Sequence, residues 1–259
     1  MRLVTWNVNS LKARMPRVLQ LLEEVGPDVV CLQETKAEAA AFPADELAEA
    51  GYEAAHHSGG RWAGVAVLAR SGRARGEEVH GLPGEARPEE ARWVEAEVDG
   101  VRVISTYVVN GREVDSPWFA EKLAFLDAMA ARVRALREAR PDQPVVLAGD
   151  LNVCRDDRDV YDPAAFAGST HVTAQERERL EALLDAGGLV DAYRDVDPDG
   201  QLFTWWDYRA GHFHKGLGLR IDYVLAGGLE VRDYAMLRDF RKGSKPSDHA
   251  PVLVELGRP

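Results

Sequence analysis

The sequence predicts an α/β fold in which two mixed β-sheets pack face to face and are flanked by helices. Segments rich in β-branched residues outnumber segments with a helical apolar period, and the two kinds alternate only loosely along the 259 residues. The order strand, helix, strand and paired strands occurs before residue 110 and again, in similar form, after residue 144. This pattern favours a mixed sheet system over a doubly wound parallel sheet.

Apolar periodicity and end signals predict three helices, over residues 16–26, 116–139 and 173–187. Pro16 suits a first helical turn, and Gly26 stops the first helix. Ser116 precedes Pro117 at the start of the second helix, which carries its apolar residues on one side. Thr173 and Glu176 have the spacing of a capping box at the start of the third.

Nine apolar, β-branched segments predict strands, at residues 2–9, 28–36, 64–70, 92–98, 101–110, 144–153, 202–208, 219–227 and 250–256. No stretch rich in Ser, Gly or Pro separates one group of these elements from another. We therefore expect residues 1–259 to form a single domain.

The composition is that of a globular protein, with 46% hydrophobic and 29% charged residues. No apolar run approaches the roughly 18 residues that suggest a membrane span, and the opening "MRLVTWNVNS" does not have the pattern of a signal peptide. Cys31 and Cys154 are too few for a disulfide framework, which suits a reducing compartment. These features predict a soluble, cytoplasmic protein that does not bind membranes.

The formal net charge of -11 argues against a protein that coats nucleic acid by bulk attraction. It does not exclude an enzyme that acts on nucleic acid, because acidic metal ligands add negative charge and a few local Arg and Lys residues can hold phosphates. Any binding of nucleic acid must therefore be local.

Polar side chains occur in or beside several predicted strands. In "PVVLAGDLNV", residues 144–153, Asp150 and Asn152 project from the same side if the strand continues. Elsewhere the same feature occurs at Asn7, Asn9, Gln33, Glu34, Tyr107, Asn110, Asp222, Asp248 and His249. Each residue alone can be explained as a turn, a cap or a core side chain.

Three of these residues, Glu34, Asp150 and Asp222, are acids in apolar surroundings. An ionised carboxylate there costs several kcal/mol unless it is paired or binds a metal. A single acidic cleft at one edge of the sheets explains all three acids together.

Carboxylates and amides, with one recurrent histidine and no cysteine, are ligands of a hard cation such as Mg²⁺ or Mn²⁺. Hydrolysis of a phosphate ester needs such a cation, a group that activates water, and donors to the phosphate oxygens. Asn7, Asn152, Tyr107 and His249 are suitable donors.

Two other motifs do not fit catalysis. The "SDH" motif at residues 247–249 lacks the geometry of a serine hydrolase triad, because adjacent residues of an extended chain point apart. His212 and His214 lack nearby partners for zinc.

The sequence resembles bacterial exonuclease III, within the endonuclease/exonuclease/phosphatase superfamily that has the deoxyribonuclease I fold. The resemblance covers essentially the whole chain. Its motifs are, in order, "TWNVNSLKAR", "PDVVCLQETK", "GDLNVCRDDRDVYDP", "GLVDAYR", "FTWWDYRAG", "GLRIDYVLA" and "KPSDHAPV". "LQETK" and "SDHAPV" are shared broadly across the superfamily, whereas "WWDYR" followed by "GLRID" is more specific to exonuclease III.

The resemblance implies a four-layered α/β sandwich with pseudo-twofold halves. It also implies a Mg²⁺-dependent DNA repair nuclease that cuts 5′ to abasic sites, degrades duplex DNA from 3′ to 5′, and removes 3′ blocking groups. The expected partner is duplex DNA with abasic sites or 3′ ends, and the expected state is a monomer.

The resemblance also implies roles for individual residues. Glu34 matches the main metal ligand, with Asn7 and Asp248 beside the metal, and Asp150, Asn152 and His249 extend the set of candidate ligands. Asp222 and His249 match a hydrogen-bonded pair at the scissile phosphate. Asp150 matches the group that activates water or protonates the leaving 3′ oxygen, and Asn152 and Tyr107 match contacts to the phosphate. The sequence leaves open whether Asp150 or His249 is the base, and whether one or two metal ions act.

Substrate contacts are implied at a small apolar pocket that receives a sugar without its base, lined by Trp205, Trp206 and Leu219. Further DNA contacts are expected at Arg61, Asn110, Arg209 and Lys245, and Lys215, Arg241 and Lys242 lie in the same predicted loops. The chain departs from the family at Val109, where proline is common, and at Ala63, where asparagine is common. Both departures bear on DNA-contacting loops.

Two other functions remain open. One is a phosphatase or phosphodiesterase of the same fold that acts on small phosphorylated substrates. The other is a non-catalytic module that binds DNA or protein. Cleavage of abasic duplex DNA with Mg²⁺ or with a chelator distinguishes the three hypotheses.

Overall fold

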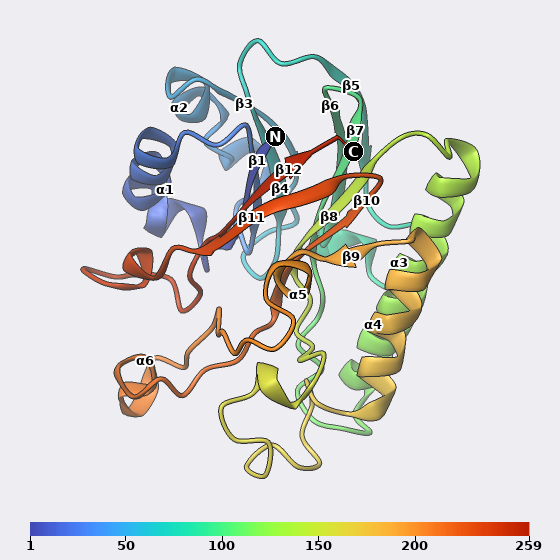
Figure 1. Ribbon diagram of the computed structural model, residues 1–259. Helices are drawn as coiled ribbons and strands as arrows, with labels where there is room; N and C mark the ends of the chain where they lie inside the picture. Colours follow the sequence, from blue (N-terminus) through green and yellow to red (C-terminus); the bar gives the residue numbers. More distant parts are fainter. Residues whose placement is uncertain (259) are drawn as a thin grey trace.

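Two six-stranded β-sheets form the centre of the computed structural model, which describes residues 1–258 (Figure 1). The first sheet has the order β11 (Glu230–Met236), β12 (Val252–Gly257), β1 (Arg2–Asn7), β2 (Val29–Gln33), β4 (Val65–Arg70) and β3 (Tyr52–His57). The second has the order β5 (Arg75–His80), β6 (Trp93–Val98), β7 (Val101–Tyr107), β8 (Val145–Asp150), β10 (Asp222–Gly227) and β9 (Val190–Asp191). The pairs β1–β2 and β7–β8 are parallel and the other pairs are antiparallel, so both sheets are mixed.

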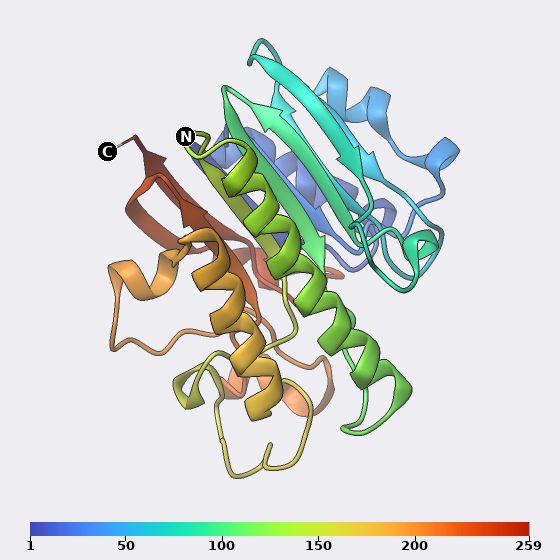
Figure 2. The ribbon, with the colours of Figure 1, turned by 90° about the vertical axis from the view of Figure 1, so that its right-hand side faces the viewer.

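Helices cover the outer face of each sheet. On the first sheet these are α1 (Leu11–Val25) and α2 (Ala44–Glu49), and on the second they are α3 (Pro117–Ala139) and α4 (Ala174–Gly187). Figure 2 shows α3 and α4 side by side. The remaining helical segments are short: α5 (Ala192–Val196), α6 (His212–Lys215), and 3₁₀ turns at Ala39–Ala41, Pro88–Glu90, Asp157–Asp159, Arg209–Gly211 and Arg238–Arg241. The predicted four-layered sandwich of two mixed sheets between helices is confirmed.

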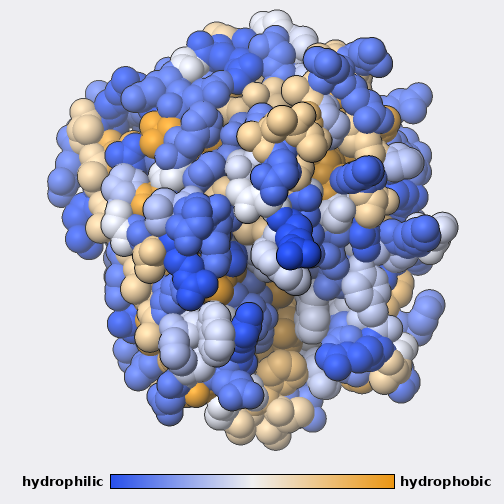
Figure 3. All heavy atoms as spheres, turned by 180° about the vertical axis from the view of Figure 1, so that it is seen from behind, coloured by the Kyte–Doolittle hydropathy of each residue, from blue (hydrophilic) through white to orange (hydrophobic). Residues whose placement is uncertain are grey.

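Alternation along the strands divides the core into three layers. In β1, Leu3 faces the other sheet while Val4 and Trp6 face α1. In β8, Val146 and Ala148 belong to the layer between the sheets, whereas neighbouring side chains pack under α3 and α4. Outside these layers the surface is largely hydrophilic, with hydrophobic residues in small patches on the face shown in Figure 3.

The two halves exchange strands. The first sheet takes β1 to β4 from the start of the chain and β11 and β12 from its end, while the second sheet takes β5 to β10. The N-terminal β1 therefore pairs with both β2 and the C-terminal β12. This exchange brings the ends of distant segments to the same edge of the molecule.

Several predicted elements differ from those observed. The first helix begins at Leu11, because Ser10 caps it by accepting from the Ala13 amide. Pro16 lies inside this helix, where a proline removes one ladder hydrogen bond. Residues 202–208 form no strand and contribute only isolated bridges from Trp205 to Leu219 and His249. Four strands were not predicted. The polar compositions of β3, β5 and β11 conceal the strand pattern, and β9 has only two residues.

No helix within residues 1–258 is long and apolar enough to cross a membrane.

Candidate active site

Rows of side chains between the sheets end in polar residues at one edge. In β1 the row through Leu3 and Thr5 ends at Asn7, and in β8 the row through Val146 and Ala148 ends at Asp150. Asp150 lies opposite Tyr107 in the parallel pair β7–β8 and opposite Asp222 in the antiparallel pair β8–β10. The strand alternation that builds the core thus delivers the polar groups to one place.

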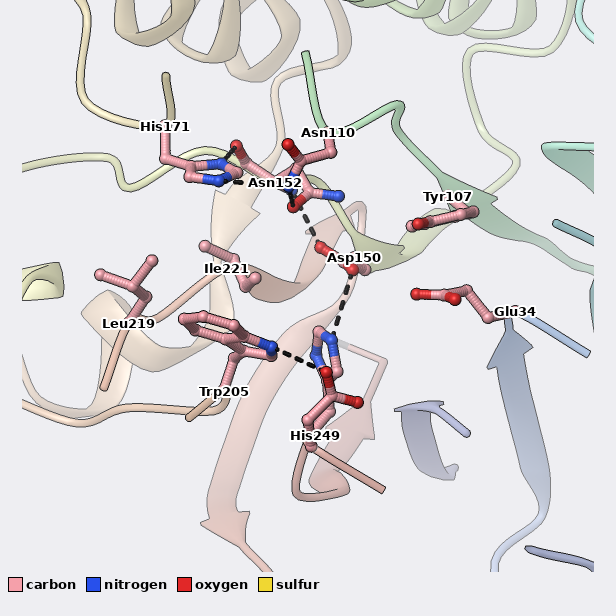
Figure 4. Close-up of a pocket in the computed structure, with 11 residues that line it drawn as sticks. Glu34, Tyr107, Asn110, Asp150, Asn152, His171, Trp205, Leu219, Ile221 and His249 are labelled. Atoms are coloured by element: carbon pink, nitrogen blue, oxygen red, sulfur yellow. Dashed lines mark hydrogen bonds and ion pairs between the residues drawn. The ribbon is translucent and has the colours of Figure 1, made fainter. Parts of the chain in front are cut away.

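A pocket of about 190 Å³ opens at this edge (Figure 4). It is lined by Glu34, Tyr107, Asn110, Asp150, Asn152, His171, Trp205, Leu219, Ile221, Asp248 and His249. Nine of these eleven residues are among the candidate site residues named from the sequence. Asn7 and Asp222 lie directly behind the pocket, since each contacts a residue that lines it.

Asn7 joins the two carboxylates that come from different sheets. Its Nδ2 donates to Glu34 Oε1 at 2.7 Å and to Asp150 Oδ2 at 2.9 Å. Glu34 follows the end of β2 with a φ of 51°, which is uncommon for a residue with a side chain. The Glu34 carboxylate also contacts the Lys36 ammonium at 2.8 Å. Glu34 and Asp150 therefore form an acidic corner of the pocket, which the Asn7 amide and the Lys36 ammonium hold in place.

His249 joins Asp222 to Asp150. Its Nδ1 lies 2.9 Å from Asp222 Oδ2, and its Nε2 lies 3.7 Å from Asp150 Oδ2. All three side chains are almost fully buried. A hydrogen bond at Nδ1 fixes the orientation of the imidazole, so Nε2 faces Asp150 and the pocket.

The burial of these groups shifts their protonation. Burial raises the pKa of the Asp150 carboxyl to about 8, with the His249 charge opposing the rise and the Asp222 charge adding to it. Burial alone would lower the pKa of His249, but the Asp222 and Asp150 carboxylates outweigh it and raise that pKa to about 10. Burial also raises the pKa of Tyr107, and the charges of Glu34 and Asp150 add to the shift. Strongly shifted pKa values that meet in a pocket are typical of catalytic sites.

Glu34, Asp150 and His249 can together hold a metal ion. One potential ligand atom from each of these residues lies within 4.8 Å of the others. This is the one such group found within residues 1–258, so His212 and His214 do not belong to a comparable cluster. Asp248 lines the same pocket, where its carboxylate accepts from Trp205 Nε1 at 3.1 Å and from Asn9 Nδ2 at 3.0 Å.

Asn152 and Asn110 form the upper side of the pocket in Figure 4. Asn152 has a φ of 51°, and its amide N–H donates to Asp150 Oδ1 at 3.0 Å. Its side-chain Nδ2 donates to the Val108 carbonyl at 2.9 Å, and Asn110 Nδ2 approaches its Oδ1 at 3.5 Å. Asp150 and Asn152 thus line one pocket, although the strand ends at Asp150 and the chain turns before Asn152.

An apolar wall faces the polar groups. Trp205, Leu219 and Ile221 lie on the side of Asp150 opposite Glu34 and Tyr107 (Figure 4). Trp205 and Leu219 are held together by backbone hydrogen bonds of 3.0 Å. Trp206 does not line this pocket: it is 2% exposed and packs against Phe213, with ring centroids 5.1 Å apart. Because successive side chains point to opposite sides, only one tryptophan of the pair can reach the pocket.

The basic residues expected to contact DNA lie outside the pocket. Arg61, Arg209 and Lys245 are exposed on three separate loops. Arg61 lies over the Trp62 ring at 5.5 Å, and Arg209 pairs with Asp207 at 2.6 Å. Arg241 is 6% exposed and donates to the Trp206 carbonyl, which does not suit a direct contact with a phosphate.

His171 and Ile221 line the pocket but were not predicted from the sequence. His171 lies in a loop with a φ of 78°, and its Nδ1 contacts the Asn152 carbonyl. Burial and the nearby Lys122 charge lower the pKa of His171 to about 3, so its ring is neutral near pH 7. A single histidine in an aperiodic loop gives no sequence signal. Ile221 lies two residues after Leu219, so alternation from that predicted pocket residue was the available signal.

Lys122 connects this side of the pocket to the helices. Its buried ammonium pairs with Glu176 and donates to the carbonyls of Asn152 at 2.6 Å and Asn110 at 3.2 Å. Glu176 is the residue that completes the predicted capping box of α4. The helix start and the pocket loops therefore share one buried ion pair.

The family model described as Endonuclease/Exonuclease/phosphatase family matches residues 4–249. An exodeoxyribonuclease of Bacillus subtilis is 32% identical over 261 residues, covering 97% of this chain and 98% of the relative.

Solved structures agree with this match. The 3′-5′ exonuclease NExo of Neisseria meningitidis has a TM-score of 0.93 and 37% identity, covering 99% of this chain and 100% of that chain. A second structure, of the 3′ phosphatase NExo from Neisseria bound to a product DNA hairpin, has a TM-score of 0.92 and 38% identity, covering 98% of each chain. An AP endonuclease of Archaeoglobus fulgidus has a TM-score of 0.92 and 30% identity, again covering 98% of each chain.

Proposed function

Because the chain belongs to the endonuclease/exonuclease/phosphatase family, we propose that it is a metal-dependent DNA repair nuclease of the exonuclease III type. Its substrates are duplex DNA with abasic sites, cut 5′ to the lesion, and duplex 3′ ends, from which it removes nucleotides or phosphates. The names of the relatives support this proposal, since they include an exodeoxyribonuclease, an AP endonuclease and a 3′ phosphatase. A monomeric state and a cytoplasmic location remain predictions from the sequence.

The observation that carries the proposal is the position of Asp150. It lies between the Asn7–Glu34 corner and the His249–Asp222 pair, at the floor of a pocket with an apolar wall. This arrangement supplies, in one place, oxygen ligands for a cation, a group for proton transfer, and donors to a phosphate. Hydrolysis of a phosphodiester needs all three.

We assign the metal to the acidic corner. Glu34 is the principal ligand, Asn7 and Asp150 adjoin it, and Asn152 and Asp248 are the other candidate donors. Oxygen donors of this kind fit Mg²⁺ or Mn²⁺. When bound, the cation supplies neutralisation of the charge that develops on the phosphate.

The proton steps are assigned to Asp150. The Asp222 carboxylate, 2.9 Å from Nδ1, raises the pKa of His249 and keeps it protonated near neutral pH, so His249 acts as a cationic donor to the phosphate and is a poor base. The Asp150 pKa of about 8 lies near the operating pH, which suits a group that exchanges a proton with water or with the leaving 3′ oxygen. Tyr107 and Asn152, on either side of Asp150, then contact the phosphate oxygens.

The test compares three DNA substrates and one small one. Purified protein is incubated with an abasic duplex, a duplex with a recessed 3′ end, a duplex with a 3′ phosphate, and a free nucleoside 3′-phosphate, with Mg²⁺ or with excess chelator. We expect cleavage of the DNA substrates with Mg²⁺ only, and loss of this activity in Asp150→Asn. Turnover of the free nucleotide alone would favour the small-substrate phosphatase, and binding without turnover would favour the non-catalytic module.

A further inference from the structure

A second hollow adjoins the active pocket, and we call it the aromatic groove. It has a volume of about 380 Å³, and its walls include Trp62, Arg92, Val109, Arg112, Trp118 and Glu121. Tyr107 and Asn110 line both this groove and the active pocket. A polynucleotide chain with a phosphate in the pocket therefore has a path into the groove.

Trp62 is the most exposed large hydrophobic side chain within residues 1–258, at 72%. It lies on the loop between β3 and β4, where no part of the core covers it. Large aromatic residues in the open are informative because burial is their usual state.

Another part of the lining is a stacked pair of Arg112 and Trp118. The Arg112 guanidinium lies 4.0 Å from the Trp118 ring centroid. Arg112 has a φ of 54°, and its amide N–H donates to Asn110 Oδ1 at 3.1 Å. Asn110 therefore positions this part of the lining as well as lining the active pocket.

The charges of the groove suit a polyanion. Arg87 pairs with Glu90 and Glu121, and Arg92 pairs with Glu90. In contrast, Arg112 in the groove lining forms no ion pair with any residue in the described range 1–258. The same holds for Arg61, which lies over the Trp62 ring but does not itself line the groove. Two tryptophans thus stand beside two uncompensated guanidinium groups, in a chain whose net charge is -11.

We propose that the aromatic groove binds an unpaired nucleobase next to the phosphate that occupies the active pocket. This inference rests on the proposed function, because that function places DNA in the pocket. Aromatic faces combined with basic side chains are the elements that bind single-stranded nucleic acid, since every base has a face that stacks. A base inside a duplex is already stacked on both sides. The groove therefore makes the enzyme prefer frayed or mispaired ends over fully paired ones.

The experiment measures binding to nicked duplexes that carry a 3′ phosphate at the nick. Every base is paired in one duplex, and in two others a single nucleotide on one or the other side of the nick is mispaired. The Asp150→Asn background prevents turnover and is common to all variants. We expect tighter binding to at least one mispaired duplex, and Trp62→Ala to weaken that binding about tenfold. Binding to the paired duplex should change by less than about twofold.

Matched variants separate stacking from general damage. Trp62→Tyr keeps an aromatic face and should retain the preference, whereas Trp62→Leu should lose it. Trp118→Leu tests the stacked pair of Arg112 and Trp118. Tyr208→Ala is the control, because Tyr208 is also an exposed aromatic residue, at 49%, but lies outside the groove. A fluorescent base analogue at the mispaired position should be quenched on binding, and less so in Trp62→Ala.

Two outcomes would overturn the inference. An equal loss of affinity for paired and mispaired duplexes would mean that the groove contacts ordinary duplex DNA. No change in any Trp62 variant would mean that no base enters the groove. Both outcomes leave the proposed function intact if the protein with Asp150 cleaves the paired DNA substrates, and that proposal fails only if it cleaves none of them.

Discussion

Glu34 and Asp150 are the two carboxylates at the centre of the site, and each comes from the end of a parallel strand pair in a different sheet. Their surroundings differ. The Glu34 side chain is 15% exposed and contacts the Lys36 ammonium at 2.8 Å. The Asp150 side chain is 2% exposed, and the charged group it approaches is His249, at 3.7 Å. These surroundings support the proposal that the two acids joined by Asn7 have different tasks, Glu34 binding a cation and Asp150 transferring a proton.

The largest expected effect comes from removing the proton at Asp150. Asp150→Asn keeps the size of the side chain and one acceptor oxygen, but its NH₂ group cannot accept a hydrogen bond or transfer the proton, so turnover should fall at least about 10²-fold. Steady-state assays on the duplex with a 3′ phosphate measure the fall. The melting temperature should stay unchanged or rise, because a buried carboxyl is replaced by a neutral amide. A variant that keeps its turnover would assign the proton step elsewhere.

Glu34→Gln should act mainly through the metal. With the carboxylate removed, the Mg²⁺ concentration for half-maximal activity should rise at least about tenfold, while high Mg²⁺ restores part of the rate. The control is Glu38→Gln, which removes an exposed acid from the same loop. Equal metal titrations for the two variants would contradict the division of tasks between Glu34 and Asp150.

Trp205 and Trp206 are adjacent in the sequence, but Trp205 lines the pocket and Trp206 is buried in the core, so their substitution should have different effects. Trp205→Ala opens the apolar wall. If this wall selects a flipped sugar without a base, as we expect from the resemblance, abasic incision should fall about tenfold more than removal of a 3′ phosphate. Trp206→Ala should instead cost about 3–5 kcal/mol of stability and lower both activities together. Activity ratios and thermal melts of both variants decide this. A change in the ratio in Trp206→Ala alone would show that the assignments are reversed.

Local pattern predicted much of the site. Alternation along β8 and β10 is visible in the sequence, and it points Asp150 and Asp222 in the directions that the structure shows. What the sequence alone does not specify is pairing at long range. The hydrogen bond between Asn7 and Asp150 joins residues 143 positions apart and depends on how the two sheets pack. From the sequence, we expected Glu34, Asp150 and Asp222 to lie in one cleft only because burying each carboxylate at a separate site would cost free energy.

Other parts of the site could not be found by pattern. His171 reaches the pocket from a loop that Lys122 and Glu176 hold in place. A residue in such a loop belongs to no helical or strand periodicity that would predict its position. Alternation predicts that Trp205 and Trp206 point in opposite directions, but it does not predict which of the two side chains lines the pocket. Arg241 seemed a surface cation by composition, yet its guanidinium stacks on Tyr208 and Phe213.

The smallest expected effect concerns the stability of the metal-free protein as a function of pH. The Asp150 pKa is raised from 3.8 to about 8, so its protonated form stabilises the fold at low pH, and this contribution is lost as pH rises from about 4 through 8. His249, raised from 6.5 to about 10, loses its contribution at higher pH. The advantage of Asp150→Asn over the parent protein in chelator should therefore grow between pH 4 and pH 8.

For Asp248 we expect the opposite dependence of stability on pH. Burial would raise its pKa, but the His249 charge and hydrogen bonds from Trp205 and Asn9 outweigh burial and lower the pKa below 3.8. A lowered pKa contributes stability above the unfolded value that is lost as pH falls, so Asp248→Asn should be most harmful above pH 4 and least harmful below it. Thermal melts of the three proteins across this range in chelator test both signs. If Asp150→Asn and Asp248→Asn changed stability in parallel with pH, the distinct environments of these two acids would not govern their protonation.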